Sequence, residues 1–199
     1  MVVFGTDRLS TLVNDVLGDV AGYETVIIGE GAVTVMVVSN AASDLENCTV
    51  QDITSTKRCD ELKILVIDAV KMPYIARNIR LAWGDRREYL LHRGAQQNRR
   101  ANYEASCGSR SGFVIKYPGK GSCDEYEFAS TAEGGAGART EEVPIREQNC
   151  QGATIKNAYY AKPGIAIGEE FLVVIANPDG IAVEPFDGLD TAKEQACGL

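Results

Sequence analysis

Carboxylates are concentrated in one stretch of the sequence, residues 122–149. A glycine-rich run interrupts this stretch, whose acidic residues are Asp124, Glu125, Glu127, Glu133, Glu141, Glu142 and Glu147. Hard divalent cations such as Mg²⁺ and Mn²⁺ prefer carboxylate and amide oxygens as ligands. A carboxylate beside such an ion can also act as a base towards water. The stretch is therefore a candidate hydrolytic metal site, and its alternative is a solvated acidic surface.

Asp124 and Glu133 can share a site only if the chain turns between them. On a single helix, at about 100° per residue, residues at this spacing would point to opposite sides. Residues 133–138 (EGGAGA) can supply a turn. They lack the Gly-Lys-Ser/Thr ending of a P-loop and the spacing of the dinucleotide fingerprint. We interpret them as a tight turn that lets a substrate backbone approach.

Nucleophilic catalysis has little support in the sequence. His92 is the only histidine, so any Ser-His-Asp or Cys-His site would have to use it. The Gly-x-Ser-x-Gly elbow of serine hydrolases does not occur. Because His92 ends an apolar run, we expect a structural histidine bonded to a backbone carbonyl. Asp187 and Asp190 near the C-terminus are expected to be solvated.

Charge is distributed unevenly along the chain. The formal net charge is −8, yet residues 71–120 contain 11 basic and 3 acidic side chains. As a whole the protein should repel nucleic acid, but a basic block between acidic ones can build a local anion-binding face. The alternative is that these arginines pair with surrounding carboxylates.

The six cysteines indicate an oxidising compartment. None forms a Cys-x-x-Cys pair, and one histidine makes a zinc site improbable. Short loops favour the disulfides Cys48–Cys59 and Cys107–Cys123, which leaves Cys150–Cys197. Six cysteines allow 15 pairings, and free buried thiols in a cytosolic protein are the alternative to any disulfides.

Hydrophobic patterning predicts the α+β class, with a small mixed sheet and short helices stapled by disulfides. Helices are expected after Thr6 to about residue 20, and over residues 74–83, 96–106 and 151–160. A hairpin is expected from residues 24–28 and 32–38. Further strands are expected at residues 62–70, 89–92 and 170–176, and near Phe128 and Val143. Residues 39–61 read as a stapled loop or linker.

The N-terminal region shows neither a membrane span nor an intact signal peptide. Its longest uncharged stretch, residues 31–43, is too short to cross a bilayer. The opening residues MVVFGTDRL lack a basic segment, and charges interrupt their apolar part. We expect either that a leader has been removed or that the chain is part of something longer.

Several motifs occur in a fixed order along residues 62–177. Residues 123–138 (CDEYEFASTAEGGAGA) contain an acidic pair and an aromatic, then Ala, then Glu-Gly-Gly. Upstream are residues 67–73 (IDAVKMP), 76–79 (ARNI) and a basic segment with Arg93 and residues 98–100 (NRR). Downstream are residues 143–144 (VP), 147–148 (EQ) and 151–152 (QG). This ordered set resembles the NucA/NucB family of secreted deoxyribonucleases.

The resemblance implies a compact endonuclease of the ββα-metal type that cuts DNA with little sequence preference. It implies that Asp124 is the general base that activates water, and that Glu125 and Glu133 shape or complete the site. Glu147 and Gln148 are then the candidates to hold a divalent ion, Mg²⁺ or Mn²⁺, from the mouth of the last helix.

The same resemblance gives the basic block a role. Arg93, Arg99 and Arg100 would clamp phosphates and stabilise charge in the transition state. Two positions depart from the family pattern. Glu127 stands where the family often has proline, which adds a charge or a ligand near Asp124, and Gln148 stands where asparagine is common.

We therefore expect a secreted, monomeric, divalent-metal-dependent deoxyribonuclease that does not bind membranes. Residues 62–180 would form the nuclease domain, residues 1–61 an N-terminal appendage and residues 181–199 a C-terminal tail. Two other functions are open. One is a catalytically inactive nuclease-like module of a larger extracellular protein. The other is a structural module whose acidic loop binds Ca²⁺.

Overall fold

The computed structural model describes residues 22–197, so the helix expected after Thr6 lies outside the described residues. The main sheet has six strands, in the order β1-β2-β8-β4-β3, and β5 also pairs with β8. Their bounds are β1 (Tyr23–Ile28), β2 (Val33–Val38), β3 (Arg58–Cys59), β4 (Leu62–Asp68), β5 (Leu90–His92) and β8 (Glu170–Ala176). Strand β8 runs parallel to β4 and antiparallel to β2 and β5.

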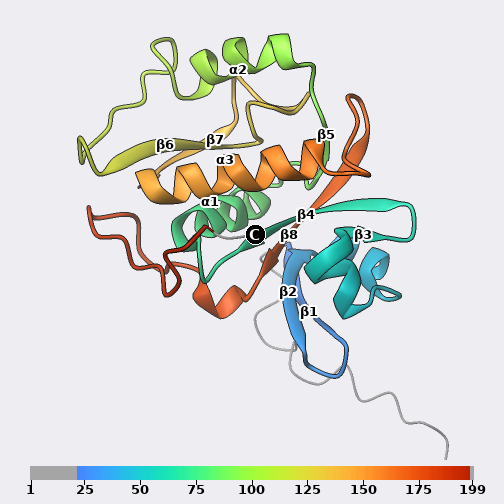
Figure 1. Ribbon diagram of the computed structural model, residues 1–199. Coiled ribbons are helices and arrows are strands. Elements are labelled where there is room, and N and C mark those ends of the chain that lie inside the picture. The colour runs from blue at the N-terminus through green and yellow to red at the C-terminus, as the bar shows by residue number, and fades with distance from the viewer. Residues whose placement is uncertain (1–21, 198–199) are drawn as a thin grey trace, which may run out of the picture.

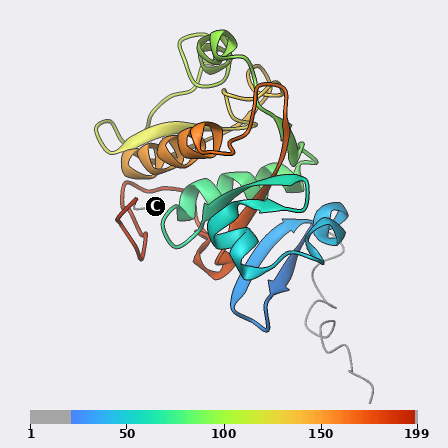
Figure 2. The same ribbon diagram turned by 45° about the vertical axis from the view of Figure 1, so that its right-hand side comes forward.

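A second layer contains the hairpin of β6 (Gly121–Tyr126) and β7 (Arg139–Pro144). Within residues 22–197, three α-helices complete the fold: α1 (Pro73–Gly84), α2 (Arg99–Ser106) and α3 (Ile145–Tyr160). Helix α3 follows β7 directly, so β6, β7 and α3 form a continuous β-β-α unit. Figures 1 and 2 show this unit between α2, at the top, and the main sheet, with the β1–β2 hairpin at the bottom of the molecule. Helix α1 contacts the unit and also β4.

Strand β8 supplies the centre of the core because both of its faces are covered. Phe171, Val173 and Ile175 pack in the cluster that includes α1 and α3. Leu172 and Val174 pack on the other face, with β2 and the short turns of residues 39–56. A strand buried on both faces reads as a continuous apolar run rather than an alternating one, which is why residues 170–176 were recognisable from sequence.

The α+β class and a disulfide-stapled mixed sheet are confirmed. Most strands and helices lie close to their expected positions, with two clear differences. Residues 39–61, expected as a stapled loop or linker, contain two short helical turns and strand β3 of the main sheet. Helix α3 begins at Ile145, six residues before the expected start at Gln151. The first turns of α3 bury Glu147, Cys150 and Gln151, and two of these three, Glu147 and Gln151, are polar. Because these side chains are polar, the hydrophobic periodicity that marks a helix is missing there.

The three disulfides Cys48–Cys59, Cys107–Cys123 and Cys150–Cys197 are present as expected. Strand β2 pairs with β8 through Val35 and Met36, so residues 22–61 share one sheet with the core. The division at residues 61 and 180 stays a prediction. Within residues 22–197, no helix has the length and apolar character needed to span a membrane.

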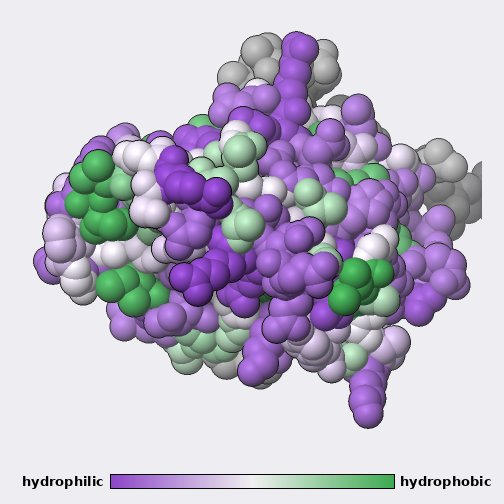
Figure 3. Space-filling view, turned by 90° about the horizontal axis from the view of Figure 1, so that it is seen from above, coloured by the Kyte–Doolittle hydropathy of each residue, from purple (hydrophilic) through white to green (hydrophobic). Residues whose placement is uncertain are grey.

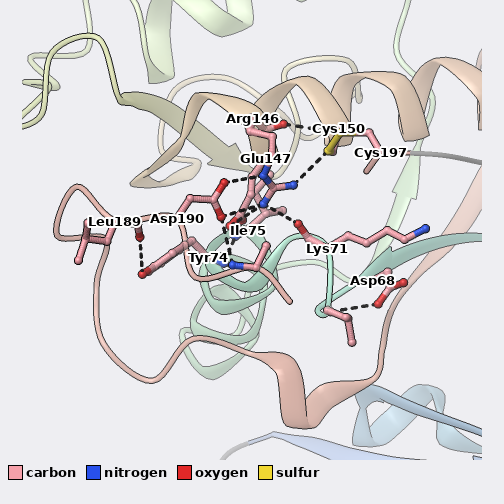
Figure 4. A network of polar contacts seen from close by, with 12 residues as sticks. Asp68, Lys71, Tyr74, Ile75, Arg146, Glu147, Cys150, Leu189, Asp190 and Cys197 are labelled. Carbon is pink, nitrogen blue, oxygen red and sulfur yellow. Dashed lines mark hydrogen bonds and ion pairs between the residues drawn. A yellow bond between two sulfur atoms is a disulfide. The ribbon is translucent and has the colours of Figure 1, made fainter. Parts of the chain in front are cut away.

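The C-terminal residues 181–197 pack over the first turns of α1 and α3 rather than extending into solvent. Phe186 is buried and makes edge-on ring contacts with Tyr74 and Tyr117. Asp190 was expected to be solvated, but it pairs with both Nε and Nη2 of Arg146. Arg146 also donates to the carbonyl oxygen of Lys71, and Figure 4 shows it at the centre of this network.

Candidate active site

Asp124 lies on β6, facing α1 and α3, and is completely buried. Its Oδ2 accepts a hydrogen bond of 2.9 Å from the Asn78 amide on α1. Its Oδ1 accepts one of 2.7 Å from the Gln151 amide on α3. Both oxygens are thus held by neutral amide donors from two helices, which fixes the carboxyl group in the β-β-α unit.

A charged network surrounds the Asp124–Asn78 pair. Asn78 Oδ1 accepts a hydrogen bond of 2.7 Å from Arg139 on β7. Arg139 also pairs with Glu141 at 3.2 Å, and Arg77 of α1 binds the other oxygen of Glu141. Since Glu141 is the cross-strand partner of Asp124 in the hairpin, the network connects both strands to α1.

Burial gives Asp124 an unusual proton affinity. It raises the pKa of Asp124 to about 8, and the charges of Glu125 and Glu141 add to the effect. The hydrogen bonds from Asn78 and Gln151 act in the opposite direction and lower the pKa of Asp124. A carboxyl group with a pKa near the working pH can both take up and release a proton.

Glu125 lies on the opposite face of β6 from Asp124, as the two-residue period of a strand requires. Its Oε1 accepts the N–H of Ala129 at 3.3 Å, and its Oε2 lies 3.2 Å from the disulfide sulfur of Cys107. Burial raises the pKa of Glu125 to about 7, while the Ala129 hydrogen bond and the Arg99 charge lower it. The two neighbouring acids therefore face different surroundings.

Glu133 contacts β5 rather than α1 or α3. Its carboxylate accepts the backbone N–H of His92 and lies 2.8 Å from the ring Nδ1 of the same residue. The expectation that the His92 ring bonds to a backbone carbonyl is therefore wrong, because its partner is a carboxylate. The other ring nitrogen lies 3.7 Å from Glu170.

The glycine turn serves the protein's own backbone. A Cβ atom at Gly134 would collide with the carbonyl oxygen of Phe128, so the close approach is to the chain itself. Gly135 has a φ of +116°, which side-chain-bearing residues rarely adopt. Glu127 accepts the N–H of Glu88 at 3.3 Å and lies 4.0 Å from Arg87, so its carboxylate is engaged away from Asp124.

Glu147 is buried in the first turn of α3, four residues before Gln151 on the same face. Its Oε2 accepts the N–H groups of Tyr74 and Ile75 at 3.0 and 3.1 Å, at the beginning of α1 (Figure 4). Burial raises the pKa of Glu147 to about 8, against the hydrogen bond from Ile75.

Two oxygen atoms at the start of α3 suit a hard cation. Glu147 Oε1 and Gln148 Oε1 are buried and have no hydrogen-bond partner. The cation nearest to Glu147 Oε1 is Arg146, at 3.7 Å. No group of three His, Cys, Asp or Glu side chains in residues 22–197 is arranged as a metal cage. Free carboxylate and amide oxygens are the type of ligand that Mg²⁺ takes, one or two from the protein with water completing its shell.

The basic residues Arg93, Arg99 and Arg100 differ in whether their guanidinium groups already have partners within the protein. Arg93 donates through Nη1 to the carbonyl oxygens of Tyr159 and Ile165. Its guanidinium also lies over the rings of Tyr159 and Tyr160, at 4.7 and 4.8 Å from the centroids. Its charge is thus largely used in joining β5 to the end of α3.

Arg99 and Arg100 are exposed at the start of α2. Neither has a salt bridge or side-chain hydrogen bond to another residue of the described chain, 22–197. Figure 3 looks down on the side of the molecule where α2 lies, and this face is mostly hydrophilic with only separate apolar patches. Arg99 is close enough to Glu125 to lower the pKa of that carboxyl.

The structure thus brings Asp124 together with Gln151 of α3, whereas Glu147 binds the beginning of α1 and Glu125 and Glu133 have other partners. Asn78, Arg139 and Gln151 are site residues that the sequence reasoning did not assign. Residues 76–79 and 151–152 were noted as motifs, so the signal was present for two of them. Their role depends on which atoms meet across α1, β6 and α3, which spacing within one element does not reveal.

Comparison with known proteins agrees with this arrangement. The family model described as Deoxyribonuclease NucA/NucB matches residues 82–174, from the end of α1 into β8. The match spans the entire β-β-α unit and both arginines of α2. No curated protein matches the chain. Over residues 82–174, the chain is similar to the NucA/NucB family of deoxyribonucleases.

Proposed function

We propose that the protein is a secreted endonuclease that hydrolyses DNA with the help of a divalent cation and little sequence preference. The observation that carries this proposal is Asp124, which amides from α1 and α3 hold in the β-β-α unit of the family segment. Its raised pKa suits a group that removes a proton from water near neutral pH.

Asp124 can act as a base only when it is ionised and in contact with water. In the described structure it is buried and both oxygens are occupied. The proposal therefore requires that DNA binding open this region, and Gln151 is the simplest group to move. The Nε2 atom of Gln148 lies 3.5 Å from Oε1 of Gln151, so we expect Gln148 to move together with Gln151.

Glu147 and Gln148 would hold the cation through their free oxygens, as the open donors at the start of α3 suggest. When bound, a divalent ion supplies charge neutralisation at the phosphate and a lower pKa for nearby water. Arg99 and Arg100 would bind backbone phosphates, which position DNA without reading its sequence. Glu133 would hold the loop that follows β6 through its contacts with His92.

Secretion is part of the proposal because of the disulfides. All six cysteines are paired in the structure. Such bonds form and persist in oxidising environments and are rare in the cytosol. We also propose that the protein is a monomer, which a measurement of its mass in solution would test.

The test is incubation of metal-free protein with supercoiled plasmid, alone and after addition of Mg²⁺ or Mn²⁺. We expect nicking and then linearisation with metal, and none with EDTA. A mock preparation from cells that do not express the protein controls for contaminating nucleases, and Asp124→Ala tests the role of Asp124.

The other outcomes separate the alternatives. Metal-dependent stabilisation without cleavage would support a structural cation module. DNA binding without cleavage under all metal conditions would support an inactive nuclease-like module. Cleavage that Asp124→Ala retains in full would remove Asp124 from the mechanism while leaving a nuclease.

A further inference from the structure

A cavity of about 690 Å³ lies between β4, the turn of residues 52–56 and the C-terminal half of α3. The groups that could bind a ligand are three lysines and one aspartate, together with hydroxyl and amide side chains. The charged ones are Lys57, Lys63, Lys71 and Asp68. An excess of positive charge is unexpected in a protein whose net charge is −8.

Lys63 is the most unusual of these residues. Its side chain lies on β4 and the residue is only 6% exposed. It has no salt bridge or side-chain hydrogen bond to any residue within 22–197. Its cross-strand partner on β3 is Arg58, another cation, which pairs with Glu61. A lysine is rarely buried to this degree without a partner, because removing its charge from water is unfavourable.

The other charged groups of the cavity do not neutralise Lys63. Lys57 donates to the carbonyl oxygen of Ile53 at 2.6 Å, and Lys71 pairs with Glu194 at 3.9 Å. Asp68 Oδ1 accepts hydrogen bonds from the N–H of Val70 and the amide of Asn177. Burial and the charge of Lys71 lower the pKa of Lys57, while Asp68 raises it. The cavity lining therefore contains three lysines and one carboxylate, and that carboxylate forms no hydrogen bond or ion pair with Lys63.

We propose that this cavity binds a phosphate monoester, with the phosphate at Lys63 and the attached group along the apolar wall. Lysine acts towards phosphate as a point charge, and Ser55 and Asn157 add polar groups to the lining. The volume falls within the range of small-molecule sites. This inference does not depend on nuclease activity, because none of the proposed catalytic residues lines the cavity.

The competing explanation is that Lys63 only packs its aliphatic stem and directs its ammonium group to water in the cavity. The two explanations differ in what removal of the charge does. If Lys63 is a ligand-binding group, Lys63→Met removes affinity for phosphate. If it is only a packing group, the same substitution leaves affinity unchanged, because methionine retains most of the stem.

The experiment is calorimetric titration of the full protein with thymidine 5′-monophosphate, inorganic phosphate and thymidine, at low ionic strength with EDTA. Lys63→Met is compared with the native protein and with Lys156→Met, an exposed α3 lysine outside the cavity. We expect the monophosphate to bind and phosphate to bind more weakly. Lys63→Met should lower the affinity for the monophosphate at least about tenfold, a change of about 1.4 kcal/mol in binding free energy. Lys156→Met should leave it unchanged.

A second variant covers the case in which Lys63→Met does not fold. Lys57→Met removes another cation of the cavity and should weaken binding in the same direction. Thymidine binding as tightly as its monophosphate would overturn the proposal, since the phosphate would then contribute nothing. Undetectable binding by the native protein, or equal binding by all variants, would overturn it as well.

Discussion

Among single residues, Asp124 shows most directly how environment sets chemistry. Two amides hold its oxygens, yet neither brings a full charge, so burial dominates and the pKa rises to about 8. The cationic side chains nearby, Arg139 and Arg77, are used by Glu141 instead. The result is a carboxyl group that is mostly protonated at neutral pH in the absence of cation and DNA.

The pH dependence of cleavage follows from this environment. If Asp124 is the base, only its ionised form is active, so kcat/KM should rise with pH and level off above about pH 8. Asp124→Asn should lower the rate by about 10²–10⁴-fold and remove this rise. Steady-state cleavage from pH 5.5 to 9 measures both.

Asp179→Asn provides the matched control, because it removes one exposed carboxylate from the Pro178–Gly180 turn. Its profile should match that of the native protein. If Asp124→Asn keeps the native profile with only a lower rate, another group is the base.

At this scale the sequence identified the acidic residue but not the residues that hold it. Asp124 stands in a conspicuous acidic motif, whereas Asn78 and Gln151 are ordinary amides in helices. Glu125 and Glu133 seemed equivalent to Asp124 by type, yet strand alternation and the His92 contact direct them elsewhere. To distinguish Asp124 from Glu125 and Glu133, one must know where each side chain points, and the positions of the acidic residues in the sequence do not give that direction.

Among the elements, β6 is the one whose position matters most for the candidate site, because it carries Asp124. Cys123, the residue before Asp124, is bonded to Cys107. This bond joins the end of α2 to β6, and the intervening chain is closed into a loop. Glu142 of β7 holds the same loop by accepting the N–H groups of Lys116 and Tyr117 at 2.8 and 2.9 Å. The loop is thus fixed by the disulfide and by several hydrogen bonds, which include one from Ile145 N–H to the carbonyl oxygen of Lys120.

Removing the Cys107–Cys123 bond should therefore reduce activity more than removing Cys48–Cys59. We expect Cys107→Ser/Cys123→Ser to lose activity at a temperature where it remains folded, because β6 is less well positioned. Cys48→Ser/Cys59→Ser should lose stability, by roughly 2–4 kcal/mol, with little change in activity. Cleavage rates and far-ultraviolet circular dichroism of both variants test this. Equal activity would show that the disulfide does not position Asp124.

The elements themselves were largely predictable because apolar periodicity carries their signal. Strand β8 and the β1–β2 hairpin bury apolar side chains and were recognised near their true bounds. The first turns of α3 were missed because Glu147 and Gln151 replace apolar residues on the buried face. The place where the pattern fails is the place where the candidate site lies, which is expected when function overrides packing.

For the molecule as a whole, the proposed function requires that an acidic protein bind an acidic polymer. The basic side chains of residues 71–120 do not act as one face. Arg77 and Arg93 are engaged in internal contacts, whereas Arg99 and Arg100 remain exposed. If Arg99 and Arg100 supply most of the phosphate contacts, the salt dependence of DNA binding should be shallow, since its slope scales with the number of contacts.

Substitution of these two arginines tests that view. In Arg99→Ala/Arg100→Ala, the slope of log Kobs against log salt should flatten by about two units, one for each lost contact. Lys156→Ala/Lys162→Ala removes the same charge from exposed positions elsewhere and should leave the slope unchanged. Binding is measured by fluorescence anisotropy with EDTA, so that cleavage does not interfere. An equal effect of both pairs would mean that only net charge matters.

The buried carboxyl groups also make the stability of the whole molecule depend on pH. Asp124, Glu125 and Glu147 have pKa values raised to about 8, 7 and 8 in the folded protein, from model values of 3.8, 4.5 and 4.5. Between about pH 5 and 8 the folded state therefore binds more protons than the unfolded state. Its free energy of unfolding must fall as pH rises through this range.

We expect the unfolding temperature to be higher at pH 5.5 than at pH 8, measured by calorimetry with EDTA. Asp124→Asn removes one of the three groups without changing side-chain size and should reduce this difference, whereas the exposed Asp179→Asn should not. Mg²⁺ held by Glu147 would favour its ionised form, so added Mg²⁺ should stabilise the protein more at pH 8 than at pH 5.5. An unfolding temperature that rises from pH 5.5 to pH 8 without metal would contradict the buried, protonated state of these groups.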